Sequence, residues 1–389
     1  MSNHYSPADQ RALRAVAVQF FINGAVLASY VPRLPEVRDA LNTDLSTIGQ
    51  IITGASVAGL LGSWLSDRII RAVGTRGAMI YGTIGLVICL PLIAYASSVW
   101  TLALVLAALM MVDVVVDIAM NMQGSAISAR RSTPVMNRLH GLWSVGTVAG
   151  GSLAATMAAL AVPLHWHLLG AAGVMLLGLW YIGGGLLKTD RKPQEAGDKT
   201  AQVRAKRAPL SLWIFGLLGA TAFIPEMVAG DWSAFRLNDD LQAGAGTAAL
   251  GFVAFSCGMV LGRLSGDWVA AKTDRGSLLK YATLIAGGGY VLACLIDSVP
   301  AAFIGFVLAG LGISVLFPSL YDAAAQDPHR PGAALGAITA ASRIAMLVSP
   351  LMIGFLADTS LFSVGMAMIV MALPCLLIIG GLSRRAFGG

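Results

Sequence analysis

Long apolar runs recur along this chain of 389 residues, and they limit its fold more than any other feature. Each run has about 20 residues, the length a helix needs to cross the hydrocarbon of a bilayer. Backbone polar groups cannot remain unpaired in lipid, so these runs are expected to be helices. The sequence predicts an all-α membrane protein with twelve transmembrane helices, at residues 12–31, 47–66, 78–97, 100–123, 139–161, 166–187, 210–229, 247–268, 278–297, 301–322, 333–356 and 362–382.

Charged residues are too few for a water-soluble protein. They make up 12% of the chain, against about 25% in a typical soluble domain. Hydrophobic residues make up 57%, so a soluble fold could not cover its surface with polar groups, and lipid is expected to be the main solvent. The cysteines lie in apolar runs without metal-ligand spacing and are interpreted as free buried thiols. They are Cys89, Cys257, Cys294 and Cys375.

The distribution of Lys and Arg predicts the orientation in the membrane. Of the 26 basic residues, only Arg33, Arg38 and Arg236 lie between spans on the side opposite the N-terminus, while Arg263 and Arg343 fall inside spans. The others lie on the N-terminal side, and basic loops remain in the cytoplasm. Because the number of spans is even, both termini are expected in the cytoplasm. The expected location is the inner (cytoplasmic) membrane of the cell.

One polar, basic segment divides the predicted spans into two sets of six. It covers residues 188–209 and is expected to be a cytoplasmic linker close to anionic lipid headgroups. The predicted domains are therefore an N-terminal six-helix half at 1–187 and a C-terminal six-helix half at 210–389.

The two halves also carry identical residues at several positions when they are aligned at an offset of 200 residues. The matching pairs are Ser56 and Ser256, Gly62 and Gly262, Asp67 and Asp267, Tyr81 and Tyr281, and Thr83 and Thr283. With six helices in each half, the two copies have the same orientation, so parallel repeats are predicted. In transporters built from such repeats the binding site lies near the bilayer midplane, between the repeats.

The loop after the second span carries a recognisable pattern of charges and glycine. It runs from Asp67 to Arg76 and resembles the signature loop of the major facilitator superfamily, with an acid, basic residues and a glycine. The acid of this chain, Asp67, stands one helical turn earlier than the acid of the family pattern. At this position it shares a helix face with Arg71. The resemblance implies a gating latch between the halves. Its expected members are Asp67, Arg68, Arg71, Gly74, Arg76, Arg263 and Asp267.

Three further stretches narrow the resemblance to one branch of that family. Residues 29–35, residues 117–124, and the dipeptides Pro225-Glu226 and Asp231-Trp232 resemble the fucose-permease-like and rhizopine-permease-like transporters. The resemblance implies a secondary transporter whose substrate is a small polar solute, such as a sugar, a polyol or an inositol-like compound. An uncharged residue would be expected at Arg343 in a sugar permease, so Arg343 argues against a simple neutral sugar as the substrate.

The fourth predicted helix carries a polar stripe of Asp113, Asp117 and Asn121, spaced four residues apart on one face. A charged side chain inside a bilayer is energetically costly, so each one in a span is expected to have a structural or functional role. The two acids repel each other, and low dielectric disfavours their charge, so one of them is expected to hold a proton near neutral pH. They are interpreted as proton-coupling residues, with Asn121 as a substrate contact. The alternative is a structural pair neutralised by an arginine.

Other polar residues inside spans are candidates for the same site. Arg343 would bind an anionic substrate group, or pair with an acid of the fourth helix. Gln19 and Asn23 would clamp hydroxyl groups, or join helices. Trp143 would stack on a sugar ring, or only pack. Glu226 would be a gate or second proton site, or a carboxylate at the interface.

These observations favour a proton-coupled secondary transporter that works by alternating access, with protons, a small-molecule substrate and the lipid bilayer as its partners. A drug or metabolite exporter is the first alternative, and a non-transporting membrane receptor is the second. No phosphate-binding loop is present, so ATP is not expected to drive transport. We expect no enzyme activity, no cofactor, no metal and no nucleic acid, and a monomeric protein.

Overall fold

The computed structural model describes residues 7–130, 135–187, 210–327 and 330–387, and within them it contains helices and no strand. Short 3₁₀ segments η1 (Val31–Arg33) and η2 (Ile93–Tyr95) and a π-helical turn η3 (Arg236–Asp240) connect some of the helices. The α-helices are α1 (Pro7–Tyr30), α2 (Leu34–Ala40), α3 (Leu45–Leu92), α4 (Val99–Ser128), α5 (Met136–Ala159), α6 (Leu164–Gly183), α7 (Leu210–Phe235), α8 (Ala245–Ala270), α9 (Arg275–Leu295), α10 (Val299–Ile313), α11 (Leu316–Ala325), α12 (Pro331–Asp358) and α13 (Val364–Phe387).

Within the described part of the chain, eleven helical segments are long and apolar enough to cross a membrane. The predicted all-helical membrane fold is therefore confirmed, but not as twelve separate helices. The predicted spans 47–66 and 78–97 both fall on α3 and the adjoining η2, because the charged segment between them is itself helical up to a kink at Gly74. The predicted linker 188–209 lies outside the described residues.

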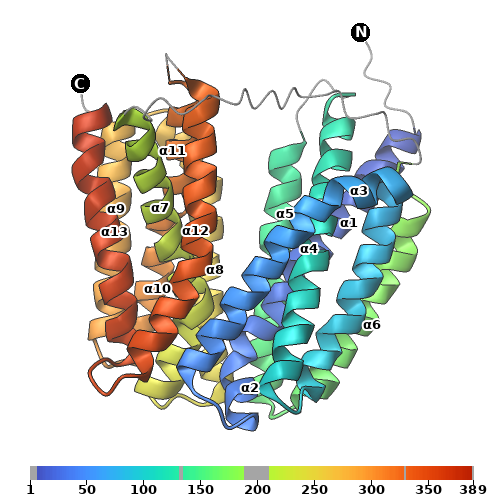
Figure 1. The fold of residues 1–389 in the computed structure, drawn as a ribbon, viewed down its shortest axis with the longest axis horizontal. Helices are drawn as coiled ribbons and strands as arrows, with labels where there is room; N and C mark the ends of the chain where they lie inside the picture. Colours follow the sequence, from blue (N-terminus) through green and yellow to red (C-terminus); the bar gives the residue numbers. More distant parts are fainter. Residues whose placement is uncertain (1–6, 131–134, 188–209, 328–329, 388–389) are drawn as a thin grey trace.

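Gly74 is the point at which α3 changes direction. Its backbone has φ 72° and ψ 166°, so the helical path is interrupted there. Positive φ costs glycine little because it has no Cβ. Figure 1 shows α3 rising from the lower end of the molecule, turning at the top and coming down again. The glycine predicted in the signature loop thus lies at the kink between the two antiparallel helical segments of α3.

Asp44 starts α3 by capping its first turn. Its carboxylate accepts a hydrogen bond of 2.6 Å from the backbone N–H of Thr47, which satisfies one of the free donors of a helix N-terminus. Hydrogen bonds from the Thr47 side chain and backbone hold the pKa of Asp44 below its ordinary value.

The predicted span 301–322 is broken in the structure into α10 and α11. The break lies at Ser314 and Val315, and Pro318 follows within the first turn of α11. Proline has no backbone N–H, so Pro318 cannot donate to the carbonyl of Ser314 four residues earlier. One hydrogen bond of a continuous helix is thus missing at this break.

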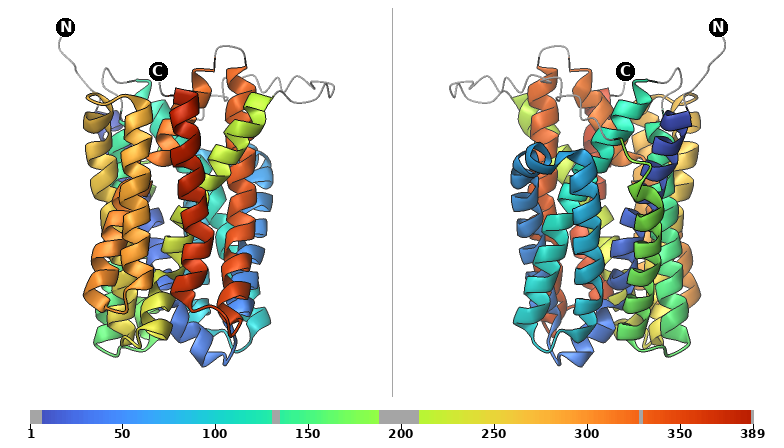
Figure 2. Two further views of the ribbon diagram at one scale, coloured as in Figure 1. Left: turned by 90° about the vertical axis from the view of Figure 1, so that its left-hand side faces the viewer. Right: turned by 90° about the vertical axis from the view of Figure 1, so that its right-hand side faces the viewer.

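The helices form two groups side by side. Figures 1 and 2 show α1–α6 on one side and α7–α13 on the other, with α1 beginning and α13 ending at the same end of the molecule. The ribbons of the two groups diverge toward that end and meet at the opposite end, near α2. We call the meeting point, where Arg38 pairs with Asp239 and Gly49 packs against Pro350, the closed end.

Two glycines allow α3 and α12 to cross in contact at the closed end. A Cβ added to Gly49 would lie 2.5 Å from the carbonyl oxygen of Pro350, and one added to Gly354 would lie 2.5 Å from the carbonyl oxygen of Leu45. Real Cβ atoms do not come this close to backbone, so only glycine fits at either position. Backbones that touch in this way give close van der Waals packing between helices in lipid.

Two further contacts join the groups of helices. One packs α5 against α8, and the other is an ion pair. Gly246 lies against Ala159, where an added Cβ would be 2.5 Å from the Ala159 Cβ. The guanidinium of Arg38 is ion-paired with Asp239 across the two groups and lies 5.5 Å from the centre of the Phe235 ring. These contacts join the two groups at the closed end.

The outer surface of the bundle is apolar. Trp100 is 80% exposed and Trp180 is 84% exposed, and Trp64, Trp166, Trp213 and Trp268 are exposed as well. Tryptophan is enriched where a protein meets the interfaces of a bilayer. This surface therefore suits a protein surrounded by lipid.

Residues paired at the offset of 200 lie in similar surroundings. Gly62 of α3 packs against the backbone of α4 at Met111, and Gly262 of α8 packs against the backbone of α10 at Leu311. The other described pairs share their burial: Ser56 with Ser256 and Thr83 with Thr283 are buried, and Tyr81 with Tyr281 are exposed. This agreement is what two parallel repeats would produce.

Candidate substrate and proton site

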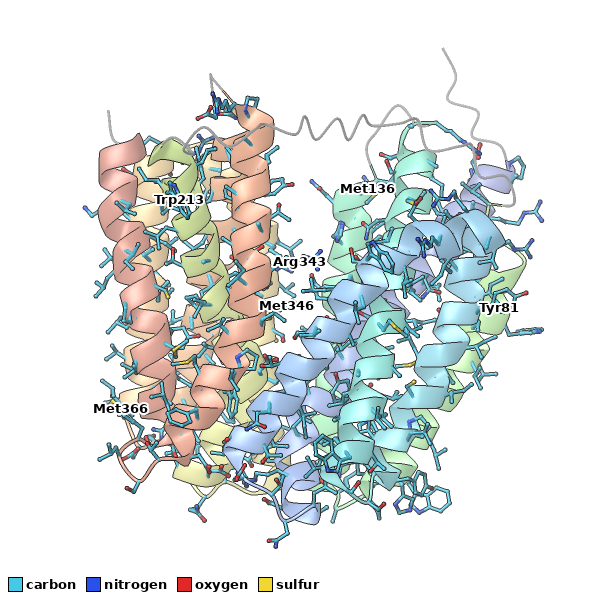
Figure 3. The ribbon with its side chains drawn as sticks, in the orientation of Figure 1. Tyr81, Met136, Trp213, Arg343, Met346 and Met366 are labelled. Atoms are coloured by element: carbon cyan, nitrogen blue, oxygen red, sulfur yellow. The ribbon has the colours of Figure 1, made fainter. Side chains whose placement is uncertain are left out.

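A cavity of about 260 Å³ lies between the two groups of helices. Residues of α1, α3, α4 and α5 form its wall on one side, and residues of α7, α8 and α12 form the other. Most of the lining is apolar or aromatic, and Met346 of α12 is part of it (Figure 3). The volume is near the lower end of the range for small-molecule sites.

Hydrogen bonds join three polar side chains from different helices at the α5 wall of the cavity. The side-chain amide N–H of Asn23 donates to the carboxylate of Asp113 at 2.7 Å, and the indole N–H of Trp143 donates to the Asn23 amide oxygen at 2.9 Å. Only Trp143 lines the cavity, whereas Asn23 and Asp113 are buried behind it. Buried polar groups need such partners, so Asn23 both supports Asp113 and orients the Trp143 ring.

The opposite wall carries three charged side chains. Arg263 of α8 donates to Glu226 of α7 at 3.2 Å, so these two charges compensate each other. Asp231 lies on α7, a little more than one turn after Glu226, and also lines the cavity. Glu226 and Arg263, both candidate site residues from the sequence, thus contact each other in this wall.

Asp117 and Asn121 form a local pair on α4. The Asn121 side-chain amide donates to the backbone oxygen of Asp117 at 2.9 Å and to its carboxylate at 3.1 Å. Both donor contacts of Asn121 thus stay within its own helix turn, and neither residue lines the cavity. The predicted polar stripe divides: Asp113 points toward α1, and Asp117 remains with Asn121.

Arg343 extends from α12 into the space between the groups (Figure 3). It is exposed and forms no ion pair with another described residue, but its charge is within electrostatic range of Asp117. Arg343 is not part of the cavity lining. Of the two sequence interpretations, this position is compatible with attraction to an acid of the fourth helix.

Gln19 lies away from the cavity, contrary to its expected role as a substrate contact. Its side-chain amide bonds to the hydroxyl of Thr83 at 2.9 Å, and neither side chain is exposed to any measurable degree. An amide that bridges two helices in this way stabilises their packing. The interaction therefore joins α1 to the second segment of α3.

The signature loop forms contacts within its own group of helices. Asp67 and Arg71 are ion-paired one turn apart, and Arg68 lies over the Trp64 ring with its guanidinium carbon 4.8 Å from the ring centre. Arg76 donates to the carbonyl oxygen of Gly183 in α6 at 2.7 Å, which ties the loop to the end of that helix.

The latch expected between the groups is not assembled in this conformation. Arg263 pairs with Glu226 rather than with Asp67, because both partners of that pair belong to the second group. The side chain of Asp267 lies outside the described part of the structure. Arg263 and Asp67 thus each have a partner within their own group of helices in this conformation.

In the sequence, Asp231 stands out only as part of the dipeptide Asp231-Trp232 that carries the family resemblance, and the sequence does not predict it as a site residue. The available signal was its position as an ionisable residue at the end of an apolar run, which by itself suggests function. Among the residues that the structure describes, no group of three or more His, Cys, Asp or Glu side chains could hold a metal ion.

Solved structures of transporters share this fold. One is a mutant of the nucleoside transporter NupG, with a TM-score of 0.75 and 11% identity over 96% of this chain and 98% of that one. Another is a bacterial homologue of the human lysosomal transporter Spinster in an inward-facing and occupied conformation. It has a TM-score of 0.74 and 13% identity, over 99% of this chain and 98% of that one.

Sequence relatives lead to the same class of protein, a multi-pass membrane transporter. The chain is 26% identical to the uncharacterised transporter y4wD of Sinorhizobium fredii, over 89% of this chain and 91% of that one. It is also 26% identical to the membrane protein MosC of Rhizobium meliloti, over 91% of this chain and 86% of that one. A sequence profile of the Major Facilitator Superfamily matches residues 16–350. The chain belongs to this superfamily, as its signature loop predicted.

Proposed function

We propose that the protein is a secondary active transporter that couples proton movement to the transport of a small polar solute. Candidate solutes are sugars, polyols and inositol-like compounds. The observation that carries the proposal is the cavity between the two groups of helices, next to the closed end and with Glu226 and Asp231 in its wall. A solute held between the groups could leave toward either side of the membrane as the groups rock.

Alternating access requires contacts that can separate. The closed end is held by backbone packing at Gly49 and Gly354 and by the ion pair of Arg38 with Asp239. In the opposite state the closed end would part, and the signature loop would approach α8. The pair of Asp67 and Arg71 is exposed here, so it is free to exchange partners. The latch is accordingly proposed for that opposite state.

Asp117 is the proposed carrier of the coupling proton. An ionised Asp117 attracts Arg343 across the space between the groups and favours their approach, whereas a protonated Asp117 does not. Loading and release of one proton would thus bias the motion of the two groups. Asp113 is the fallback carrier, because two acids one turn apart can titrate as a pair.

The lining of the cavity favours a second candidate, an exporter of metabolites or drugs. Its walls include the aromatic side chains of Phe223, Phe252 and Phe255, together with several methionines. Large apolar walls suit less polar solutes than a free sugar. Uptake and efflux of the same solute would use the same cavity.

Transport by purified protein in liposomes tests the proposal. A thermal-shift screen of sugars, polyols, organic acids and metabolites identifies solutes that stabilise the protein, because a ligand of the folded state raises its stability. Each stabilising solute is then added to liposomes that contain a pH-sensitive dye. We expect solute-dependent proton flux that a protonophore abolishes. Solute movement at equal rates with and without a pH gradient would contradict proton coupling, and no movement of any stabilising solute would contradict transport.

A reporter fused after Lys199 is expected to be active only in its cytoplasmic form. The reason is that Lys and Arg gather in the loops on this side, including the 188–209 segment. Paired fusions of a phosphatase, active outside, and a fluorescent protein, active inside, measure the orientation. Phosphatase activity at this position would reverse the proposed topology.

The variants Asp67→Asn and Arg71→Ala are expected to slow transport by about fivefold while leaving substrate affinity nearly unchanged, since one exposed ion pair is worth up to about 1 kcal/mol. Both residues lie far from the cavity lining, so only the exchange between states should suffer. Solute binding by calorimetry and exchange rates in liposomes separate the two effects. Lost binding with normal exchange would refute the latch.

A further inference from the structure

Asp231 is a carboxyl group in the cavity wall without a charged partner. It forms no hydrogen bond or ion pair with another residue in the described ranges, whereas the other charged groups of the lining, Glu226 and Arg263, are paired with each other. The described lining therefore carries one uncompensated carboxyl. Tyr30, another lining residue, lies within electrostatic range of Asp231.

An unpaired carboxylate in apolar surroundings is costly, and the cost falls when a cation pairs with it. The cavity also offers aromatic side chains, which attract cations to the faces of their rings. Trp143 lies on the wall opposite α7, and its indole N–H is held by Asn23, so the position of its ring is fixed. A ligand cation beside Asp231 would thus be held between an acid and aromatic walls.

Most of the cavity lining is apolar, so a ligand covered with hydroxyl groups would find few polar partners there. The hydroxyl of Ser144 donates back to the carbonyl oxygen of His140, and the hydroxyl of Thr147 donates back to that of Trp143. These two donors are therefore used within α5. A fully hydroxylated ring would leave several of its own polar groups unmatched against apolar walls, and each buried unmatched group costs about 1–3 kcal/mol.

We propose that this cavity binds a small solute that carries a protonated amine, with the Asp231 carboxylate as the counter-ion of the ammonium group and aromatic side chains against the rest of the molecule. The proposal rests on the proposed function, because it assigns a substrate class to the same cavity. It narrows that class from polar solutes in general to amines.

Binding of matched pairs of probes to the purified full-length protein tests the proposal. One pair is phenethylamine and 2-phenylethanol, which share an apolar body, and the other is glucosamine and glucose, which share a hydroxylated body. Calorimetry at pH 7 gives the affinity of each probe. In at least one pair we expect the amine to bind more tightly by about tenfold or more, as for a charge-assisted hydrogen bond.

Three variants assign that preference to one carboxylate. Asp231→Asn should remove the preference for the amine while the neutral twin binds as before, which also reports that the variant is folded. Asp231→Glu should retain a preference. Asp358→Asn is the matched control, since it removes one carboxylate from α12 outside the cavity lining and should change nothing.

Two outcomes overturn the proposal: equal binding of amine and alcohol in both pairs, or an amine preference that survives in Asp231→Asn. Liposome transport is scored separately. If amines bind through Asp231 but no solute moves across liposomes, the transport function fails and the ammonium site stands. If neutral solutes are transported and no amine is preferred, the ammonium site fails and the transport function stands.

Discussion

Replacing Asp117 with asparagine is expected to abolish accumulation of substrate against its gradient while exchange of substrate across liposomes continues. Asparagine resembles the protonated carboxyl, so the variant remains in the state in which Arg343 is not attracted across the space between the groups. Binding and rocking persist, but no proton is loaded or released. Uptake under an imposed pH difference, measured beside counterflow without one, separates accumulation from exchange.

Asp113→Asn is the matched comparison on the same helix face. Its carboxylate accepts from Asn23 and is buried behind Trp143, so its loss should alter the cavity wall and weaken binding. Accumulation by Asp117→Asn at the wild-type level under a pH difference would show that the proton does not travel on Asp117. If exchange alone survived in Asp113→Asn as well, the two acids would act as one titrating pair.

Replacing Gly354 with leucine is expected to reduce transport by roughly tenfold or more, because overpacking a close contact costs about 1–3 kcal/mol. An added Cβ would lie 2.5 Å from the carbonyl oxygen of Leu45, so α12 could no longer approach α3 at the closed end. The conformation described here would be disfavoured, and the protein would accumulate in the opposite conformation, in which the closed end is parted. Counterflow rates measure the loss.

Gly336→Leu provides the control on the same helix. Gly336 also lies in α12, but no atom lies within 4 Å of a Cβ placed there, so the same substitution meets open space. Both variants gain the same helix propensity, and only the contact at the closed end differs. Equal transport by Gly354→Leu and Gly336→Leu would show that the closed end need not close tightly for transport.

The sequence predicted the helical membrane fold well because hydropathy is a property of each segment by itself. The predicted spans fall on the observed helices with boundary differences of a few residues. The two spans predicted at 47–66 and 78–97 correspond to the two segments of α3 on either side of the kink at Gly74. The break at Ser314 and Val315, before α11, lies inside an apolar run, so hydropathy does not register it.

The site was predicted less well because it depends on which helix faces meet. The stripe of Asp113 and Asp117 could be read from spacing, but the hydrogen bond from Asn23 to Asp113 joins residues 90 positions apart. Gln19 has the same chemistry as Asn23 one turn earlier and packs against Thr83 instead. Spacing on one helix gives no information about the partner on another.

A reversible cross-link across the closed end tests alternating access most directly. Arg38 and Asp239, which pair there, are changed to cysteine in a background whose four cysteines are replaced by alanine, and a short linker with two thiol-reactive, reducible ends joins them. Exchange of a stabilising solute is measured before linking, after linking and after reduction, with each single-cysteine variant as a control. Transport is expected to be lost on linking and restored by reduction, because the closed end must part in each cycle. Undiminished exchange by the linked protein would contradict the account.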